Sequence, residues 1–248
     1  PACDVLPHRV FKAPAQAEQI AHIDFAVSMG SLCRYRRERL DQFESSANGY
    51  LGADESGRRR FGDLIARMSP GTRHPLKVGL MWSSNPARGV DWGERRAAKK
   101  SIDPQLLELL SGCHDVRFIS LQNRDAGDGA AEAPGLDLLD FQDHLRDMAD
   151  TAALIANLDL VISVDTSIAH LAGALGTPVW ILLMKSCDWR WGRELETTPW
   201  YSSARLIRQT TAGDWRPVLE TVARDLRSLA PPRASTGAAD EIASATRP

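Results

Sequence analysis

The chain has 248 residues, 43% of them hydrophobic, which is enough to bury at least one sizeable core. Its formal net charge of -2 at pH 7 excludes recognition of nucleic acid or of an anionic membrane by overall charge, so recognition must depend on local sites. No apolar run approaches the ~20 residues that a membrane-spanning helix needs, and we predict a soluble protein without a membrane span and without bound nucleic acid.

The first 75 residues have a broken pattern, which we interpret as the end of an incomplete N-terminal half followed by a linker. The predicted elements are a strand at 23–30, a polar helix at 33–45, a connector at 48–57 and a short helix at 58–68. Because the first residue is Pro1 rather than Met, we expect a processed chain or a piece of a longer protein.

From residue 76 onward strands and helices alternate, which predicts right-handed crossovers and a Rossmann-like α/β fold, a parallel sheet with helices on both faces. Strands are predicted at 76–82, 116–122, 159–164, 178–183 and 205–209, and helices at 103–112, 148–158, 166–175 and 215–229. Asp103 and Pro104 suit the cap and the first position of their helix.

We assign residues 76–230 to one α/β domain that the last helix closes. Residues 231–248 are small and polar, and a segment so poor in large apolar side chains is predicted to be a disordered tail.

Polar side chains follow the strand at 159–164. Ligands of open parallel sheets bind beyond the carboxyl ends of the strands, where helix amides are free. We predict that Thr166, the amide of Ser167 and the imidazole of His170 hold a phosphate, and that Asp165 orders the turn or binds a sugar hydroxyl. The alternatives are an ordinary helix cap without a ligand and a surface histidine without a function.

Helical spacing divides the segment 166–175 into two sides. The apolar side, which we expect to pack on the sheet, contains Ile168, Leu171, Ala172 and Leu175. On the other side His170 lies beside Gly173 and Ala174, and these small residues leave room for a ligand or another surface.

The loop after the first strand of the domain is the second candidate. Basic and hydroxyl side chains gather there, and we predict phosphate or sugar contacts from Ser83, Asn85, Arg88, Lys100 and Ser101. The alternative is a solvated charged loop. Neither a G-x-G-x-x-G nor a G-x-x-x-x-G-K-[ST] motif is present, which argues against standard dinucleotide or P-loop chemistry.

A base contact is predicted for Gln122, which follows the second strand, and for Trp189 and Arg190 in the tryptophan-rich segment after residue 183. Aromatic and arginine side chains can stack on a base or a sugar. The alternative is that this segment anchors a long loop onto the domain.

Four cysteines, Cys3, Cys33, Cys113 and Cys187, are widely separated and form neither a disulfide framework nor a C-x-x-C motif. We therefore expect reduced thiols in a cytoplasmic protein. His114 follows Cys113, but no second pair stands at metal-ligand spacing, and we predict no metal and no cofactor.

The stretch DMADTAALIANLDLVISVDTSIAHLAGALGTPVWILL, with DWRWG, ARLIRQ and GDWRPVLETVARDL after it, resembles the C-terminal part of bacterial tetratricopeptide-repeat proteins that carry a GT-B glycosyltransferase-like region. The D-T-x-x-x-H pattern is also similar to heptosyltransferases. The resemblance implies two Rossmann-like halves, of which the C-terminal half holds a nucleoside diphosphate sugar, and a tetratricopeptide-repeat region upstream.

Carried over by position, Asp165, Thr166 and His170 match the motif that binds the donor diphosphate. Ser167 stands where heptosyltransferases prefer glycine, and Lys100-Ser101 stands where an arginine-serine pair is usual, so lysine keeps the charge without the two-pronged geometry. The resemblance implies that the catalytic base belongs to the N-terminal half, and we assign that role to no residue of this chain.

These observations lead to the hypothesis of a glycosyltransferase-like protein that moves sugar from a nucleoside diphosphate to an unknown protein or glycan acceptor. Two alternatives stay open. One is a non-catalytic binding or scaffold module derived from such a domain, and the other is a nucleotide-sugar epimerase.

Overall fold

The computed structural model describes residues 35, 37, 39–43, 49–69, 76–84, 97–122 and 133–229. The chain divides into two units, Pro1–Glu44 and Ser45–Pro248. In the first unit the described residues contain one 3-10 turn, η4 (Leu40–Gln42). The strand predicted at 23–30 and the tail predicted at 231–248 lie outside the described residues.

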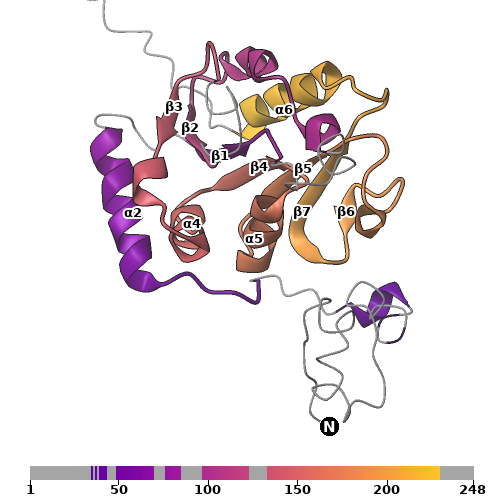
Figure 1. The fold of residues 1–248 in the computed structure, drawn as a ribbon, viewed down its shortest axis with the longest axis horizontal. Coiled ribbons are helices and arrows are strands. Elements are labelled where there is room, and N and C mark those ends of the chain that lie inside the picture. Colours follow the sequence, from indigo (N-terminus) through magenta and orange to yellow (C-terminus); the bar gives the residue numbers. More distant parts are fainter. Residues whose placement is uncertain are drawn as a thin grey trace, which may run out of the picture. The chain divides into compact units, whose positions relative to one another are not determined.

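Described residues of the second unit form a seven-stranded sheet in the order β3-β2-β1-β4-β5-β7-β6 (Figure 1). All neighbouring strands are parallel except β6 and β7. The strands are β1 (Leu76–Met81), β2 (Val116–Ser120), β3 (Leu138–Asp140), β4 (Leu160–Val164), β5 (Val179–Leu183), β6 (Thr197–Thr198) and β7 (Tyr201–Arg208). The predicted parallel α/β sheet is confirmed, and each of its five predicted strands is present.

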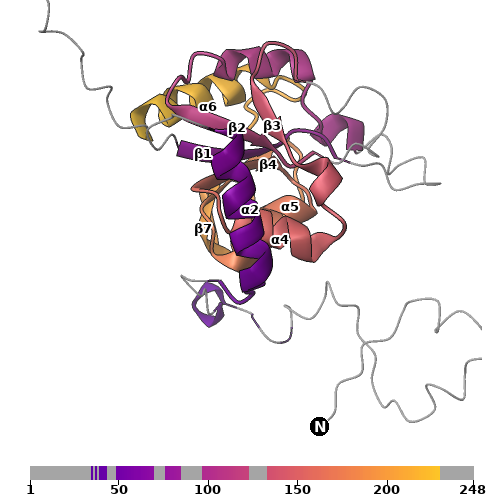
Figure 2. The ribbon, with the colours of Figure 1, turned by 90° about the vertical axis from the view of Figure 1, so that its left-hand side faces the viewer.

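Helices cover both faces of the sheet (Figures 1 and 2). On one face lie α2 (Glu55–Met68), α4 (Met148–Ile155) and α5 (Ser167–Leu175); on the other lie the 3-10 helix η5 (Pro104–Leu110) and α6 (Arg216–Leu229). Two short 3-10 turns are η7 (Gln142–His144) and η8 (Trp189–Trp191), and residues 97–100 are also helical. Because β4 and β5 are buried on both faces, their sequences do not alternate: β5 is entirely apolar, and β4 is apolar except for Ser163.

Each face of the sheet has its own apolar core. Phe61 of α2 and Leu154 of α4 pack with strand residues on the first face, and Leu107 of η5 and Leu226 of α6 pack on the second. No helix in the described ranges is long and apolar enough to cross a membrane.

The helix predicted at 103–112 is present as a 3-10 helix and ends two residues earlier. Its predicted start is confirmed: Asp103 accepts a hydrogen bond from the amide of Gln105, and Pro104 occupies the first turn. Ser111 donates to the carbonyl of Glu108, three residues back, which is the tighter spacing of a 3-10 turn.

The helix α2 belongs to the same unit as the sheet. Sequence analysis assigns residues up to 75 to an N-terminal half and linker, whereas the unit that contains the sheet starts at Ser45. Phe61 and Ile65 of α2 are buried in the first core, and Arg60 pairs with Asp150 of α4. The helix α2 therefore packs with the sheet in the unit that starts at Ser45.

Asp150 ties α2 to α4 through two arginines. Its carboxylate, 9% exposed, accepts from Arg146 Nε at 2.9 Å and from Arg60 on α2. The hydrogen bonds from Arg146 chiefly, and the charge of Arg60, lower the pKa of Asp150 to about 2. Because the pKa is depressed in the folded state, this stabilisation is complete above the unfolded value near 4 and is lost as the pH falls toward 2.

We expect Asp150→Asn to cost about 1–2 kcal/mol of unfolding free energy at pH 7, after allowance for the exposure of Arg146. The cost should shrink as the pH falls from about 4 to 2, because the native carboxylate is protonated there. Urea unfolding at several pH values measures both effects. Asp137→Asn is the matched control, since Asp137 pairs with Arg117 but is 84% exposed. If the difference in unfolding free energy between the wild type and Asp150→Asn stayed constant with pH, it would contradict the lowered pKa of Asp150.

Candidate functional site

The strand order places a topological switch point between β1 and β4. The chain goes from β1 to β2 and β3 on one side, and β4 then starts the other half of the sheet. Met81 and Ser163 are in register near the carboxyl ends of these two strands. Ligands of open α/β sheets bind in the crevice at such a point. The two polar segments singled out in the sequence therefore follow neighbouring strands.

The turn after β4 leaves the first amides of α5 without a side-chain cap. Thr166 is the N-cap residue, with extended backbone angles of φ -136° and ψ 175°, but its hydroxyl accepts no amide hydrogen. Instead Thr166 Oγ1 lies 3.1 Å from Ser163 Oγ. Ser167, at the first position of α5, is exposed. The ordinary side-chain cap, one of the alternatives above, is not formed by Thr166.

Lys100 connects the loop after β1 to this turn. Its Nζ lies 2.7 Å from Asp165 Oδ2 and donates to the Asp165 carbonyl at 3.2 Å. The two side chains are 18% and 7% exposed. Asp165 thus orders the turn by binding a cation, which is one of the two roles predicted for it. Since an ammonium group has three N–H donors, one donor of Lys100 stays available for a ligand.

Gln122 and Ser101 brace the chain after β1. The amide of Ser83 donates to Gln122 Oε1 at 3.0 Å, and the amide of Ser84 donates to Ser101 Oγ at 3.0 Å. Gln122 is 1% exposed, and its Nε2 is buried without a hydrogen-bond partner among the described residues. The predicted contacts of Gln122 with a base and of Ser101 with a phosphate stay predictions, as do those of Asn85 and Arg88, which lie outside the described residues.

His170 is half-buried and held by two aromatic side chains. Its Nδ1 lies 2.9 Å from the hydroxyl of Tyr201, and its ring stacks on Trp191 with centroids 5.1 Å apart and planes 20° apart. Burial lowers the pKa of His170; the charge of Asp165 opposes this shift, and Arg190 and Lys100 reinforce it. The imidazole is therefore neutral at pH 7.

The side of α5 that was predicted to leave room for a ligand or another surface is covered by the chain itself. Gly173 and Ala174 are buried, because Tyr201 and the segment 49–51 lie on them. The expectation of a close approach beside His170 is thus correct, and the surface that approaches belongs to this chain.

In the tryptophan-rich segment Trp191 is buried and Trp189 is exposed. Trp191 is fully buried, and Arg208 donates to the carbonyls of Trp191 and Leu195, which anchors the segment as the alternative reading expected. Trp189 is 61% exposed, and the guanidinium of Arg190 lies 5.8 Å from the centre of its ring. A base contact by Trp189 and Arg190 stays a prediction.

Tyr50 and Arg208 were missed by the sequence reading, and Tyr201 was singled out only as a member of the tryptophan-rich segment, without its partner His170. Tyr201, Tyr50 and Arg208 are each remote in sequence from the groups that they contact. The sequence signal for Tyr201 was its position after Trp200, at the start of an apolar stretch. This position indicates an aromatic side chain at the end of a strand, but it does not identify the residue that the side chain contacts.

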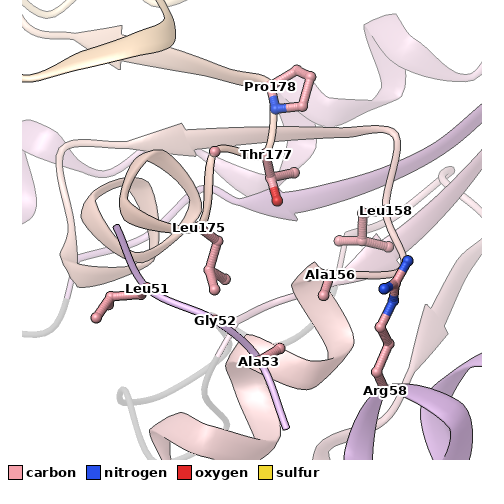
Figure 3. Close-up of a pocket in the computed structure, with 10 residues that line it drawn as sticks. Leu51, Gly52, Ala53, Arg58, Ala156, Leu158, Leu175, Thr177 and Pro178 are labelled. Atoms are coloured by element: carbon pink, nitrogen blue, oxygen red, sulfur yellow. The ribbon is translucent and has the colours of Figure 1, made fainter. Parts of the chain in front are cut away.

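A pocket of about 420 Å³ lies at the opposite edge of the sheet (Figure 3). Leu158 and Pro178, which precede β4 and β5, contribute to its wall, so the pocket is at the amino ends of these strands. The other residues of the wall include Leu51, Arg58, Ala156 and Thr177. None of the predicted site residues lines this pocket. Within the described ranges, no group of three or more His, Cys, Asp or Glu residues could hold a metal ion.

Residues 146–213, which include the turn after β4 and the tryptophan-rich segment, match the family described as Glycosyltransferase family 9 (heptosyltransferase). The chain is 30% identical over 228 residues to Protein FlbA of Caulobacter vibrioides, covering 90% of this chain and 36% of that protein. The chain thus spans about a third of the length of this curated relative.

A solved structure shares the fold. A glycosyl transferase family 9 protein from Veillonella parvula superposes with a TM-score of 0.52 at 15% identity, covering 77% of this chain and 58% of that one. The ADP-heptose LPS heptosyltransferase II of E. coli gives a TM-score of 0.47 at 16% identity, over 72% of this chain and 53% of that one.

Proposed function

We propose that this chain is the donor-binding half of a GT-B glycosyltransferase. It binds a nucleoside diphosphate sugar at the carboxyl ends of β1 and β4, and the full protein transfers the sugar to a protein or glycan acceptor. The observation that carries the proposal is the meeting of three features at the switch point: the uncapped amides of α5, the ammonium of Lys100 and the imidazole of His170.

The chemistry of a leaving diphosphate fits these groups. The first amides of α5 and the helix dipole stabilise an anion, and Thr166 can add a hydroxyl donor. Lys100 adds a positive charge, which the carboxylate of Asp165 partly neutralises. The uncharged imidazole of His170 adds a hydrogen-bond donor. Such fixed donors stabilise the negative charge that develops on the departing diphosphate, so the proposal needs no metal ion.

In this proposal the other catalytic groups lie in a part of the protein upstream of this chain. No residue of this chain is assigned as the catalytic base, so we place the base in an N-terminal half, with a tetratricopeptide-repeat region further upstream. Cys113 and Cys187, the two described cysteines, are free thiols, which supports a cytoplasmic location.

Calorimetric titration with ADP, GDP, UDP and CDP tests the proposal. We expect one of them to bind, and Thr166→Ala and His170→Ala each to weaken its affinity by about 3- to 10-fold, the effect of one hydrogen bond. Ser228→Ala on α6, whose hydroxyl bonds only to Arg224 O among the described partners, is the control and should bind like the wild type. Absence of heat with every diphosphate would favour a scaffold module, and unchanged affinity in both site variants would refute this site.

A further inference from the structure

The imidazole of His170 is fixed by the protein on one face and at one nitrogen. Trp191 covers the face, and the Tyr201 hydroxyl lies at Nδ1. The described residues provide no hydrogen-bond partner for Nε2. The ring therefore has one nitrogen held by the fold and one nitrogen left for another group.

Tyr201 reaches His170 because the next turn of α5 has a glycine. A Cβ atom on Gly173 would lie 2.4 Å from Cγ of Tyr201, so any larger residue would push the phenol ring away. The tyrosine ring packs edge-on to the imidazole, with centroids 5.8 Å apart and planes at 62°. The sequence of α5 is thus built to accept this side chain.

A second tyrosine acts on the first. The side chain of Tyr50 helps to raise the pKa of Tyr201. The segment that carries Tyr50 is fastened to the end of α5, because the amides of Tyr50 and Leu51 donate to the Ala174 carbonyl at 2.8 and 2.9 Å. Gly49, just before it, has φ 77°, and a Cβ there would lie 2.4 Å from the same carbonyl.

We infer that Tyr201 is a positioning residue that sets the tautomer of His170. Its hydroxyl donates to Nδ1, so the proton of the neutral imidazole lies on Nε2. This arrangement presents an uncharged N–H donor at the carboxyl edge of the sheet. That the donor meets a diphosphate rests on the proposed function; the tautomer itself does not.

The direction of the hydrogen bond follows from the chemistry of the two groups. A phenol is a stronger hydrogen-bond donor than a neutral imidazole, and an unprotonated imidazole nitrogen is a good acceptor.

The charge states of the neighbours agree with this arrangement. Burial raises the pKa of Tyr201, and Tyr50 adds to the shift, so the phenol keeps its proton. Burial lowers the pKa of His170, so the imidazole stays neutral. The charged groups that act on the imidazole are Asp165, Arg190, Lys100 and Asp188. Which nitrogen of a neutral histidine carries the proton is set by the bond that the other nitrogen makes.

Two-bond proton–nitrogen NMR spectra of the uniformly labelled chain, without any ligand, test the inference. His170 is assigned by its disappearance in His170→Gln. We expect the wild type to show Nδ1 as the unprotonated and Nε2 as the protonated nitrogen at pH 7. In Tyr201→Phe, which keeps the ring but removes the donor, we expect both signals to move toward the average of two exchanging tautomers. His114 and His144 are internal controls that should not change.

Two outcomes would overturn the inference: protonated Nδ1 in the wild type, or an unchanged His170 pattern in Tyr201→Phe. The wild-type spectrum decides by itself should the variant fail to fold.

The calorimetry described above separates this inference from the proposed function. If a nucleoside diphosphate binds, Tyr201→Phe should weaken its affinity by about 3- to 10-fold, because the Nε2–H donor is then present in only part of the molecules. If no diphosphate binds while the tautomer pattern is as expected, the proposed function fails and the positioning role of Tyr201 stands.

Discussion

Trp191→Ala is expected to lower the unfolding free energy by about 3–5 kcal/mol, the largest stability effect that we predict for a single substitution. Trp191 is fully buried in the core on the α5 face of the sheet and stacks on His170. Removal of the indole leaves a cavity and exposes one face of the imidazole. Urea unfolding followed by circular dichroism measures the loss.

Trp189→Ala is the matched control, since it removes the same side chain two residues away. Trp189 is 61% exposed, and its ring contacts are with Trp200 and Arg190 at the surface. We expect a cost of less than about 1 kcal/mol. Equal costs for the two substitutions would show that the tryptophan-rich segment is not anchored through Trp191.

Lys100→Met is expected to cost about 2–4 kcal/mol, because it leaves the Asp165 carboxylate, 7% exposed, without its cation. Methionine keeps most of the length of the side chain, so the loss reports the charge and the hydrogen bonds. We also expect weaker binding of a nucleoside diphosphate. Thermal and urea unfolding measure the first effect, and calorimetry measures the second.

Two further variants make the lysine prediction decisive. Lys77→Met breaks an exposed pair with Asp159, whose side chains are 35% and 43% exposed and 3.8 Å apart, and should cost at most about 1 kcal/mol. Asp165→Asn combined with Lys100→Met should be less destabilised than the sum of the two single variants, because no charge is then left unpaired. Strict additivity of the two substitutions would contradict a direct ion pair.

Much of the fold could be predicted from the sequence because its central strands are buried on both faces. The runs at 159–164 and 178–183 differ from β4 and β5 by one residue at their first position. In contrast, β3 and β6 have three and two residues, which is too short for any hydrophobic pattern to appear. The packing of α2 was missed because its partners on α4 lie about 90 residues further along the chain, as the Arg60–Asp150 pair does.

The site was partly predictable for a related reason. The rule that ligands bind at the carboxyl ends of parallel strands singled out Asp165, Thr166 and His170 from the sequence. What each side chain contacts could not be read in the same way, because the partners are distant in sequence. Lys100 is 65 residues from Asp165, and Tyr201 is 31 residues from His170. Pairings of this kind are decided by the order of the strands, which local patterns do not determine.

The attachment of residues 49–68 to the sheet has a practical consequence for anyone who shortens this protein. A chain cut at residue 76, where the alternation of strands and helices begins, would lack Phe61 and Ile65 and would leave the apolar surface of α4 open to water. It would also lack the amides of Tyr50 and Leu51, which donate to the Ala174 carbonyl at the end of α5. A truncated version that keeps the helix–loop segment from Gly49 onward retains both the apolar cover and these hydrogen bonds.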